Sequence, residues 1–361
     1  MKKIIRRRVL VLAISFAVIA IGQIAYDHLI LISVLSNGTA PSYNFINVLL
    51  INIASGFFGG LVAGFTLNYI DSKFRGKPFY YGLAIIITMF LAVWAIQNII
   101  LAIEITESKE LTFNWQVNAA DIKDMMFWTF MVLLGYFFLQ MSNKFGPGNL
   151  MPIFLGKYDK PFDEKRIFML LDLKSSTTIA ENLGNIEYHQ FLKKIFSDVT
   201  NPIMDAGGEI YQYVGDEIVI SWPVGKEKNH LKYAECFFSI QSFLESKKQN
   251  YLKDFGQEPV FKAGAHLGEV TAGEIGVIKR DITYSGDILN TAARIQGLCN
   301  ELESKFLISD DLFRFSTGIS DEYSINVLGT IPLRGKTENL QLIDVSKKNH
   351  YKYHSNRFQK K

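Results

Sequence analysis

Hydrophobic and polar positions divide this chain into two halves. Up to about residue 142, long apolar runs follow one another with few charges, and beyond it apolar and polar residues alternate over short distances. Four of the runs come close to the roughly 20 residues that a helix needs to cross the hydrocarbon core of a membrane: residues 9–32, 45–69, 80–103 and 125–141. The pattern therefore predicts an α-helical, four-span membrane domain over residues 1–142.

Basic residues flank these runs on one side only. Five lie within the first eight positions and three more within residues 71–77, whereas residues 33–44 contain none and residues 104–123 are mainly acidic. The positive-inside rule then places both chain ends in the cytoplasm, in a multi-pass protein of the cell membrane. A cleaved signal peptide is the alternative for the first run, but that run is long for one and lacks a small-residue cleavage site.

The second apolar run contains Gly56, Gly60 and Gly64, which form two overlapping G-x-x-x-G patterns. Such spacing lets helices approach closely, either inside the bundle or across a dimer face, and the sequence does not choose between the two. The run of spans carries almost no mid-membrane charge, which argues against a transporter or channel. Sensing of an unknown signal by this domain is a hypothesis only.

The second half alternates strand and helix patterns. Residues 143–165 form a predicted linker whose Gly146, Pro147 and Gly148 interrupt any continuous helix. Beyond it we predict strands at residues 166–173, 209–214, 217–222 and 260–265, and helices at residues 177–206, 230–251 and 287–298. This order predicts an α+β, ferredoxin-like (palm) domain over residues 166–346. Residues 347–361 form a basic tail, predicted to be a surface or disordered segment.

Charge and cysteine content narrow the range of partners. The chain has 38 Lys and Arg against 35 Asp and Glu, a net charge of +3, and its clearest basic cluster is the one before the first span. Without a basic stripe interleaved with aromatics, nucleic acid is not an expected partner. Cys236 and Cys299 lack metal-site spacing and are predicted to be buried thiols.

Two aspartates carry the first chemical signal. Asp172 ends an apolar strand and Asp216 follows Gly215 in a hairpin turn, so a palm topology brings both carboxylates to one sheet edge. Paired hard carboxylates with room for phosphate oxygens favour Mg²⁺ over zinc. Ser175, Ser176 and Thr177 open the next helix, whose free N–H groups suit a phosphate chain. An N-cap aspartate and an ordinary turn aspartate remain the alternative interpretation.

A second signal lies on the helix predicted at residues 287–298. Asn290 and Arg294 are four residues apart and therefore share one helix face. An amide that orients a ribose and a guanidinium that binds phosphate are groups that phosphoryl transfer uses. Taken alone, the pair is better explained as two surface residues on an amphipathic helix.

Together these segments resemble the catalytic domain of class III adenylyl and guanylyl cyclases. The matching pieces, in family order, are the strand ending in Asp172 with its Ser/Thr run, Gly215-Asp216, residues 262–270, and residues 286–294. The resemblance covers roughly residues 166–345. It implies conversion of a nucleoside triphosphate into a cyclic nucleotide and pyrophosphate, with active sites shared across a homodimer.

The resemblance also implies roles for individual residues. Asp172, Asp216 and the backbone carbonyl of Leu173 would hold two Mg²⁺ or Mn²⁺ ions per site. Asn290 would orient the ribose and Arg294 would stabilise transition-state charge. Lys336 is the candidate for binding the terminal phosphates.

Base choice is where the chain departs from the family pattern. Gln212 stands where adenylyl cyclases usually have Lys and guanylyl cyclases Glu, and Thr283 matches one adenylyl subclass. A Gln amide both donates and accepts, so it is able to read either purine. ATP is the expected substrate and GTP the alternative.

Two rival functions remain. The stretch from Gly207 to Ile210 superficially resembles the signature turn of diguanylate cyclases, but it opens a strand and leaves Asn290 and Arg294 without a role. A decayed, nucleotide-binding receptor module is the other rival. Decay would be expected to remove the aspartates or the Asn/Arg pair first, and all four residues are present.

Overall fold

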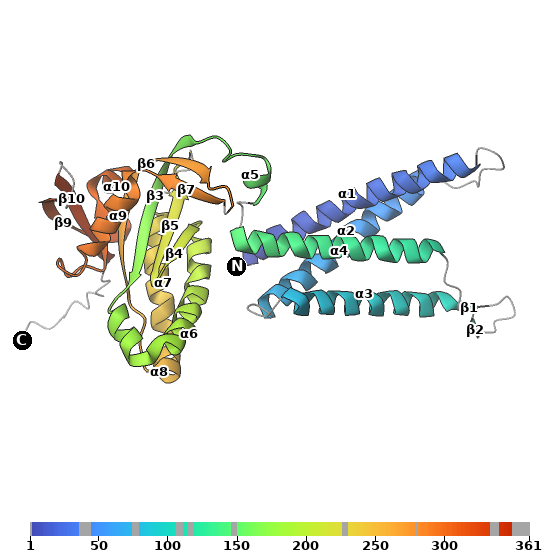
Figure 1. Cartoon of the computed structure of the whole chain (residues 1–361), viewed down its shortest axis with the longest axis horizontal. Coiled ribbons are helices and arrows are strands. Elements are labelled where there is room, and N and C mark those ends of the chain that lie inside the picture. The colour runs from blue at the N-terminus through green and yellow to red at the C-terminus, as the bar shows by residue number, and fades with distance from the viewer. Residues whose placement is uncertain are drawn as a thin grey trace, which may run out of the picture. The chain divides into compact units, whose positions relative to one another are not determined.

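The computed structural model describes residues 2–35, 45–73, 79–105, 111–113, 119–145, 150–225, 230–278, 280–332 and 339–348. The chain divides into two compact units, Met1–Pro147 and Gly148–Lys361, which we describe separately (Figure 1). Residues 146–149, residues 333–338, which include Lys336, and all residues from 349 on lie outside the described part of the chain.

The first unit contains four long helices, and each predicted apolar run lies within one of them, except that Ile103, the last residue of the third run, begins a short strand. They are α1 (Lys2–Leu35), α2 (Phe45–Lys73), α3 (Phe79–Ala102) and α4 (Ala119–Phe145), with short strands β1 (Ile103–Ile105) and β2 (Leu111–Phe113) between the last two. Within the described residues, α1, α2 and α4 have stretches long and apolar enough to span a membrane, and α3 has a shorter one at Tyr80–Met89.

The glycines of α2 pack against α1. A Cβ added at Gly60 would lie 2.7 Å from Ala13 Cα, and one added at Gly64 would lie 3.0 Å from Val9 Cα. At Gly56 the nearest atom would be Ala20 Cβ, at 2.8 Å. Side chains at these positions would force the helices apart, so the small-residue stripe serves packing within the chain.

The second unit contains a sheet with the order β4-β5-β3-β6-β8-β10-β9, to which β7 adds by pairing with β6. Its strands are β3 (Phe162–Leu173), β4 (Glu209–Val214), β5 (Glu217–Pro223), β6 (Phe261–Ile275), β7 (Asp281–Ser285), β8 (Phe306–Ser309), β9 (Tyr323–Pro332) and β10 (Asn339–Lys347). Its helices are α5 (Leu150–Phe154), α6 (Ser176–Asp205), α7 (Lys232–Ser246), α8 (Lys248–Phe255), α9 (Asp287–Gly297), α10 (Asp310–Phe315) and α11 (Ile319–Glu322). The β3–α6–β4–β5–α7/α8–β6 portion has the connectivity expected for a ferredoxin-like palm.

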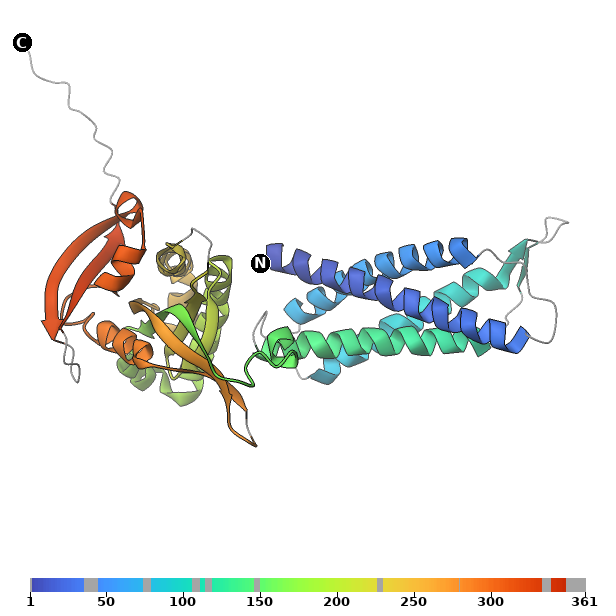
Figure 2. The same ribbon diagram turned by 90° about the horizontal axis from the view of Figure 1, so that it is seen from above.

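Several predicted boundaries were wrong. β3 begins at Phe162 because it pairs with β6 along its whole length, from Phe162 opposite Ala272 to Leu173 opposite Phe261. For the same reason β6 runs far beyond the predicted residues 260–265, and its second half forms a hairpin with β7 that projects from the sheet (Figure 2). The predicted helix 230–251 is two helices, because Lys247 leaves the helical conformation.

Other elements were not predicted at all. The predicted linker 143–165 contains α5 and the start of β3, and β10 reaches Lys347, where the tail was expected to begin. The strands β7 to β10 also extend the sheet well beyond the palm. Of these, β8 pairs in parallel with β6, from which it is separated by β7 and α9, whereas β7 pairs with the preceding β6 and β10 with the preceding β9.

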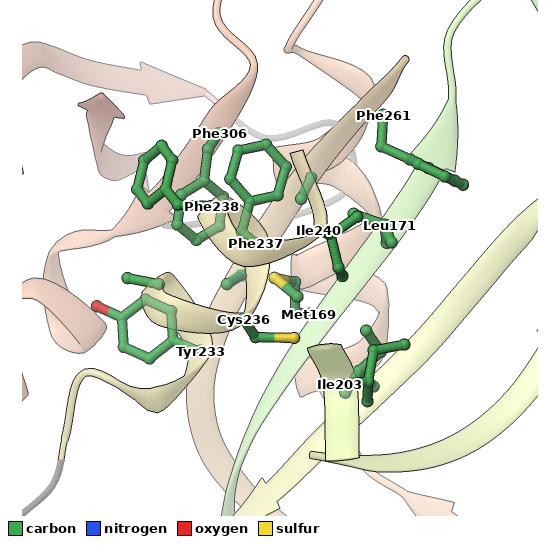
Figure 3. Packing of buried hydrophobic residues seen from close by; sticks show 14 of the residues in the cluster. Met169, Leu171, Ile203, Tyr233, Cys236, Phe237, Phe238, Ile240, Phe261 and Phe306 are labelled. Atoms are coloured by element: carbon green, nitrogen blue, oxygen red, sulfur yellow. The ribbon is translucent and has the colours of Figure 1, made fainter. Parts of the chain in front are cut away.

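The central strand β3 separates two apolar layers. Met169 and Leu171 face the larger core, together with Phe237 of α7 and Phe306 of β8 (Figure 3). Phe168 and Leu170 face the other side, where Ile288 and Ala292 of α9 cover them. Successive strand residues point to opposite faces, and both faces of β3 are covered, so both sets of residues are apolar.

Gly264 of β6 brings α9 against the sheet. A Cβ at this position would lie 2.3 Å from the backbone N of Gln296 and 2.7 Å from the carbonyl O of Ala292. No real Cβ approaches backbone atoms so closely, and backbone atoms cannot rotate away as a side chain does. The position of α9 over the sheet thus depends on the missing side chain.

We predict that Gly264→Ala displaces α9 and lowers the free energy of unfolding by about 1–3 kcal/mol, the usual cost of overpacking. Thermal unfolding of the detergent-solubilised chain measures the effect. Gly297→Ala is the matched control, because nothing lies within 4 Å of a Cβ there. Equal stability of the two variants would contradict the tight contact.

Candidate active site

The two predicted metal ligands lie at one end of neighbouring strands. Asp172 is the penultimate residue of β3, and Asp216 occupies the turn between β4 and β5, after Gly215 in a left-handed conformation with φ of 63°. Since β5 pairs with β3 up to Leu171 opposite Ile218, the turn lies beside the end of β3. The two aspartates therefore lie close together, as the sequence predicts.

The carboxylates repel one another in a half-buried setting. Burial raises the pKa of Asp172, Lys262 opposes that rise, and the charge of Asp216 adds to it. Burial together with the charges of both aspartates raises the pKa of neighbouring Glu217 from 4.5 to about 7. The side chains thus concentrate negative charge where solvent screening is reduced.

This arrangement fits a divalent cation. Asp216 Oδ2 is buried and accepts no hydrogen bond from the chain, so this oxygen is available to a cation. Hard carboxylate oxygens are the donors that Mg²⁺ and Mn²⁺ prefer. Among the described residues no three His, Cys, Asp or Glu side chains cluster for a metal, so an ion held here would need further oxygen ligands besides the two carboxylates. The backbone carbonyl of Leu173, whose side chain is buried, is adjacent to Asp172.

The start of α6 lies directly after this carboxylate. Ser175 has left-handed φ of 59° and ψ of 31°, and its side chain does not cap the helix. Ser176 and Thr177 form the first turn, in which backbone N–H groups have no intrahelical acceptor. The turn is therefore able to bind an anion next to Asp172.

The two predicted side chains of α9 differ in exposure. Asn290 is exposed, whereas Arg294 is half-buried and its Nη1 has no hydrogen-bond partner. In the described chain, no hydrogen bond or ion pair joins either residue to Asp172 or Asp216. A buried guanidinium nitrogen without an acceptor suits an anionic ligand.

A β-bulge orients Gln212. The register of β4 against β5 shifts between Ile210 and Gln212, which leaves Tyr211 as the extra residue. Gln212 is therefore opposite Val219 and shares its α9-facing side of the sheet; regular alternation would have turned it toward the larger core. Sequence reasoning did not foresee this bulge.

Thr283 is placed differently from Gln212. It lies on β7 with its Oγ1 3.4 Å from the carbonyl O of Gly273. Neighbouring Tyr284 packs its ring 5.4 Å from that of Phe168, and successive strand residues leave opposite faces. No hydrogen bond links Gln212 and Thr283 in the part of the chain that the structure describes.

Two polar residues that the sequence did not single out touch Asp172. Gln296 Nε2 donates to Asp172 Oδ2 at 2.9 Å, and Lys262 Nζ lies 3.2 Å from the same oxygen. Lys262 is directly opposite Asp172 in the β3–β6 register. Register prediction between β3 and β6 would have revealed Lys262, but Gln296 depends on the packing of α9.

The comparison with known families agrees with this geometry. The family model of the adenylate and guanylate cyclase catalytic domain matches residues 158–348. The chain belongs to this family. The match spans the palm and the strands that extend it, and the expected class III cyclase resemblance is thereby confirmed.

Individual cyclases are similar to the same part of the chain. Adenylate cyclase 2 of Rhizobium meliloti is 38% identical over 178 residues, which are 49% of this chain and 49% of that protein. An adenylate cyclase of Anabaena cylindrica is 26% identical over 180 residues, 49% of this chain and 36% of that protein. The chain thus spans about half the length, or less, of the curated relatives it matches.

A solved structure shares the fold of this domain. A bacterial light-regulated adenylyl cyclase superposes with a TM-score of 0.52 at 18% identity, covering 65% of this chain and 68% of the other. At this identity the similarity concerns the fold alone.

The raised pKa of Glu217 predicts a pH-dependent stability in the absence of metal. Between its ordinary pKa of 4.5 and about 7, Glu217 of the folded chain keeps a proton that the unfolded chain has lost. Stability should therefore fall as pH rises through this window, and Glu217→Gln should lessen the fall. Melting temperatures in EDTA from pH 5 to 8 measure it; parallel curves for the two proteins would contradict the assignment.

Proposed function

We propose that this cyclase is a membrane-bound adenylate cyclase that converts ATP into 3′,5′-cyclic AMP and pyrophosphate. The observation that carries the proposal is the convergence of Asp172 and Asp216 at the end of β3, with the orphaned Asp216 Oδ2. The 38% identity to an adenylate cyclase across this domain supports the choice of product.

Each site residue has a role in the proposed reaction. Asp172, Asp216 and the Leu173 carbonyl would hold two Mg²⁺ or Mn²⁺ ions, which when bound supply Lewis-acid activation of the ribose 3′-hydroxyl and neutralise phosphate charge. Ser175, Ser176 and Thr177 offer N–H and hydroxyl donors to the phosphate chain. Outside the described residues, Lys336 is the proposed partner of the terminal phosphates.

We assign Asn290 and Arg294 to the ribose and to charge on the reacting phosphate. Neither bonds to the aspartates of its own chain, and Arg294 Nη1 has no acceptor there. A twofold homodimer would complete two sites, each with aspartates from one chain and the Asn/Arg pair from the other. The single-chain geometry supports this sharing, because the aspartates and the Asn/Arg pair are both in place but, among the described residues, do not bond to each other.

Gln212 is proposed to read the purine. Its bulge-directed side chain is exposed on the α9 side of the sheet. The amide is able to accept from adenine N6 and to donate to N1. Thr283 faces away from the Gln212 side of the sheet, and its assignment to the nucleotide rests on the family resemblance alone. GTP remains the alternative substrate, since the same amide also complements the guanine edge.

The first unit is proposed to span the cell membrane four times, over residues 1–142, with the catalytic domain over residues 166–346 in the cytoplasm. Three described helices have the necessary length and apolarity, and α3 is the proposed fourth. The basic residues at the amino terminus and in the α2–α3 connection support this topology. A signal acting on this unit is part of the proposal without a named ligand.

Complementation tests the shared sites. Asp172→Ala and Arg294→Ala chains should each be inactive, because either change removes one half of both sites. Co-expressed, they should recover about one quarter of wild-type activity, since half the dimers are mixed and each mixed dimer has one intact site. Immunoblotting checks equal expression, and no recovery would contradict sharing.

Product analysis tests the substrate. Purified full-length protein with Mn²⁺ and equal ATP and GTP should form cyclic AMP in excess of cyclic GMP, measured by mass spectrometry. Asp216→Asn should abolish product without loss of folding, because it removes charge and keeps shape. Excess cyclic GMP would establish the guanylate cyclase alternative, and a cyclic dinucleotide would overturn the proposed reaction.

A further inference from the structure

Gln296 is a buried amide whose hydrogen bond goes to a metal ligand. Its side chain is on α9 and the residue is 8% exposed. A carboxylate only accepts hydrogen bonds, so the NH₂ group of Gln296 faces Asp172 Oδ2, at 2.9 Å. Burial of an amide is costly unless such a bond is made, so this contact holds both side chains in place.

The contact restrains the orientation of Asp172. Gln296 Nε2 and Lys262 Nζ, from α9 and β6, both meet Oδ2 rather than one oxygen each. Two donors on one oxygen limit rotation of the carboxylate about its Cβ–Cγ bond. Oδ1 is thereby kept in one direction relative to the end of β3 and the Asp216 turn.

The position of Gln296 is itself fixed by backbone packing. Its backbone N lies where a Cβ on Gly264 would come within 2.3 Å, so this turn of α9 rests directly on β6. Gly264 is two residues beyond Lys262, the other donor to Asp172. The helix contact and the hydrogen bond therefore act on the same point of the sheet.

We propose that Gln296 is a positioning residue that orients Asp172 for the divalent ions and links α9 to the metal site of its own chain. The inference rests on the proposed function. In the proposed dimer, Asn290 and Arg294 of the same helix act in the opposite site. Each α9 thus contacts both active sites, one through Gln296 and the other through the Asn/Arg pair.

Mixed dimers with a single working site separate these two effects. A metal-side chain carries Arg294→Ala and keeps Asp172, and an arginine-side chain carries Asp172→Ala and keeps Arg294. Two affinity tags isolate the mixed dimer. Gln296→Leu is then placed on one chain or the other, and activity is measured against Mg²⁺ concentration.

On the metal-side chain, Gln296→Leu should raise the half-saturating Mg²⁺ concentration about tenfold or more, the usual effect of losing a hydrogen bond to a metal ligand. On the arginine-side chain it should change activity by no more than about twofold. An equal rise in the half-saturating Mg²⁺ concentration on both chains would show that Gln296 only stabilises the packing of α9, and would overturn the proposal.

Direct binding of Mn²⁺ provides a readout independent of turnover. Full-length wild-type protein and Gln296→Leu are titrated with Mn²⁺ in the presence of pyrophosphate, and free Mn²⁺ is followed by electron paramagnetic resonance. The variant should bind about tenfold more weakly. Gln249→Leu, an exposed glutamine of α8, is the matched control and should bind as wild type does.

The two experiments fail in distinguishable ways. An inactive mixed dimer before any change at Gln296 contradicts the shared-site function, and the Mn²⁺ titration still tests Gln296 in the homodimer. Unchanged Mn²⁺ affinity in Gln296→Leu contradicts the positioning role alone. Gln296→Met, unbranched and favourable in a helix, replaces the leucine variant where that one does not fold.

Discussion

Pairing of β3 with β5 on one side and β6 on the other is the constraint on which the catalytic unit depends. Because β3 is central, its odd-numbered and even-numbered residues are committed to different apolar layers, Met169 to one and Phe168 to the other. The strand therefore has little freedom of register. Asp172 lies on this strand, so its position is fixed by the same pairing. The tight β4–β5 turn places Asp216 beside it.

Stability and function oppose each other at this end of the sheet. Asp172, Asp216 and Glu217 share a half-buried region, where burial and then the charges of the two aspartates raise the pKa of Glu217 to about 7. The apolar layers on either side of β3 offset that repulsion, and Lys262 moderates it. Such a concentration of carboxylates suits a divalent ion, since a cation replaces their mutual repulsion by attraction.

Close backbone packing at glycine recurs in both units, with different consequences. In the first unit Gly60 seats α2 on α1, and the contact serves the helical bundle alone. In the catalytic unit Gly264 seats α9 on β6, and the same contact determines where Gln296, Asn290 and Arg294 lie. The close contact at Gly60 thus sets the packing of two helices, whereas the one at Gly264 also sets the position of the α9 side chains that we assign to the active site.

The sequence by itself determined the two-part organisation, the apolar helices, the palm order of elements and the convergence of Asp172 with Asp216. Hydrophobic periodicity and a Gly-Asp turn are local signals, so they can be recognised from the sequence before the fold is known. The length of β6, the bulge at Tyr211 and the bond from Gln296 to Asp172 were decided only by tertiary structure. The length of β6 and the Gln296 bond depend on partners distant in the chain, β3 and Asp172. The bulge depends on how β4 pairs with the neighbouring β5, and local residue preferences do not specify any of these pairings.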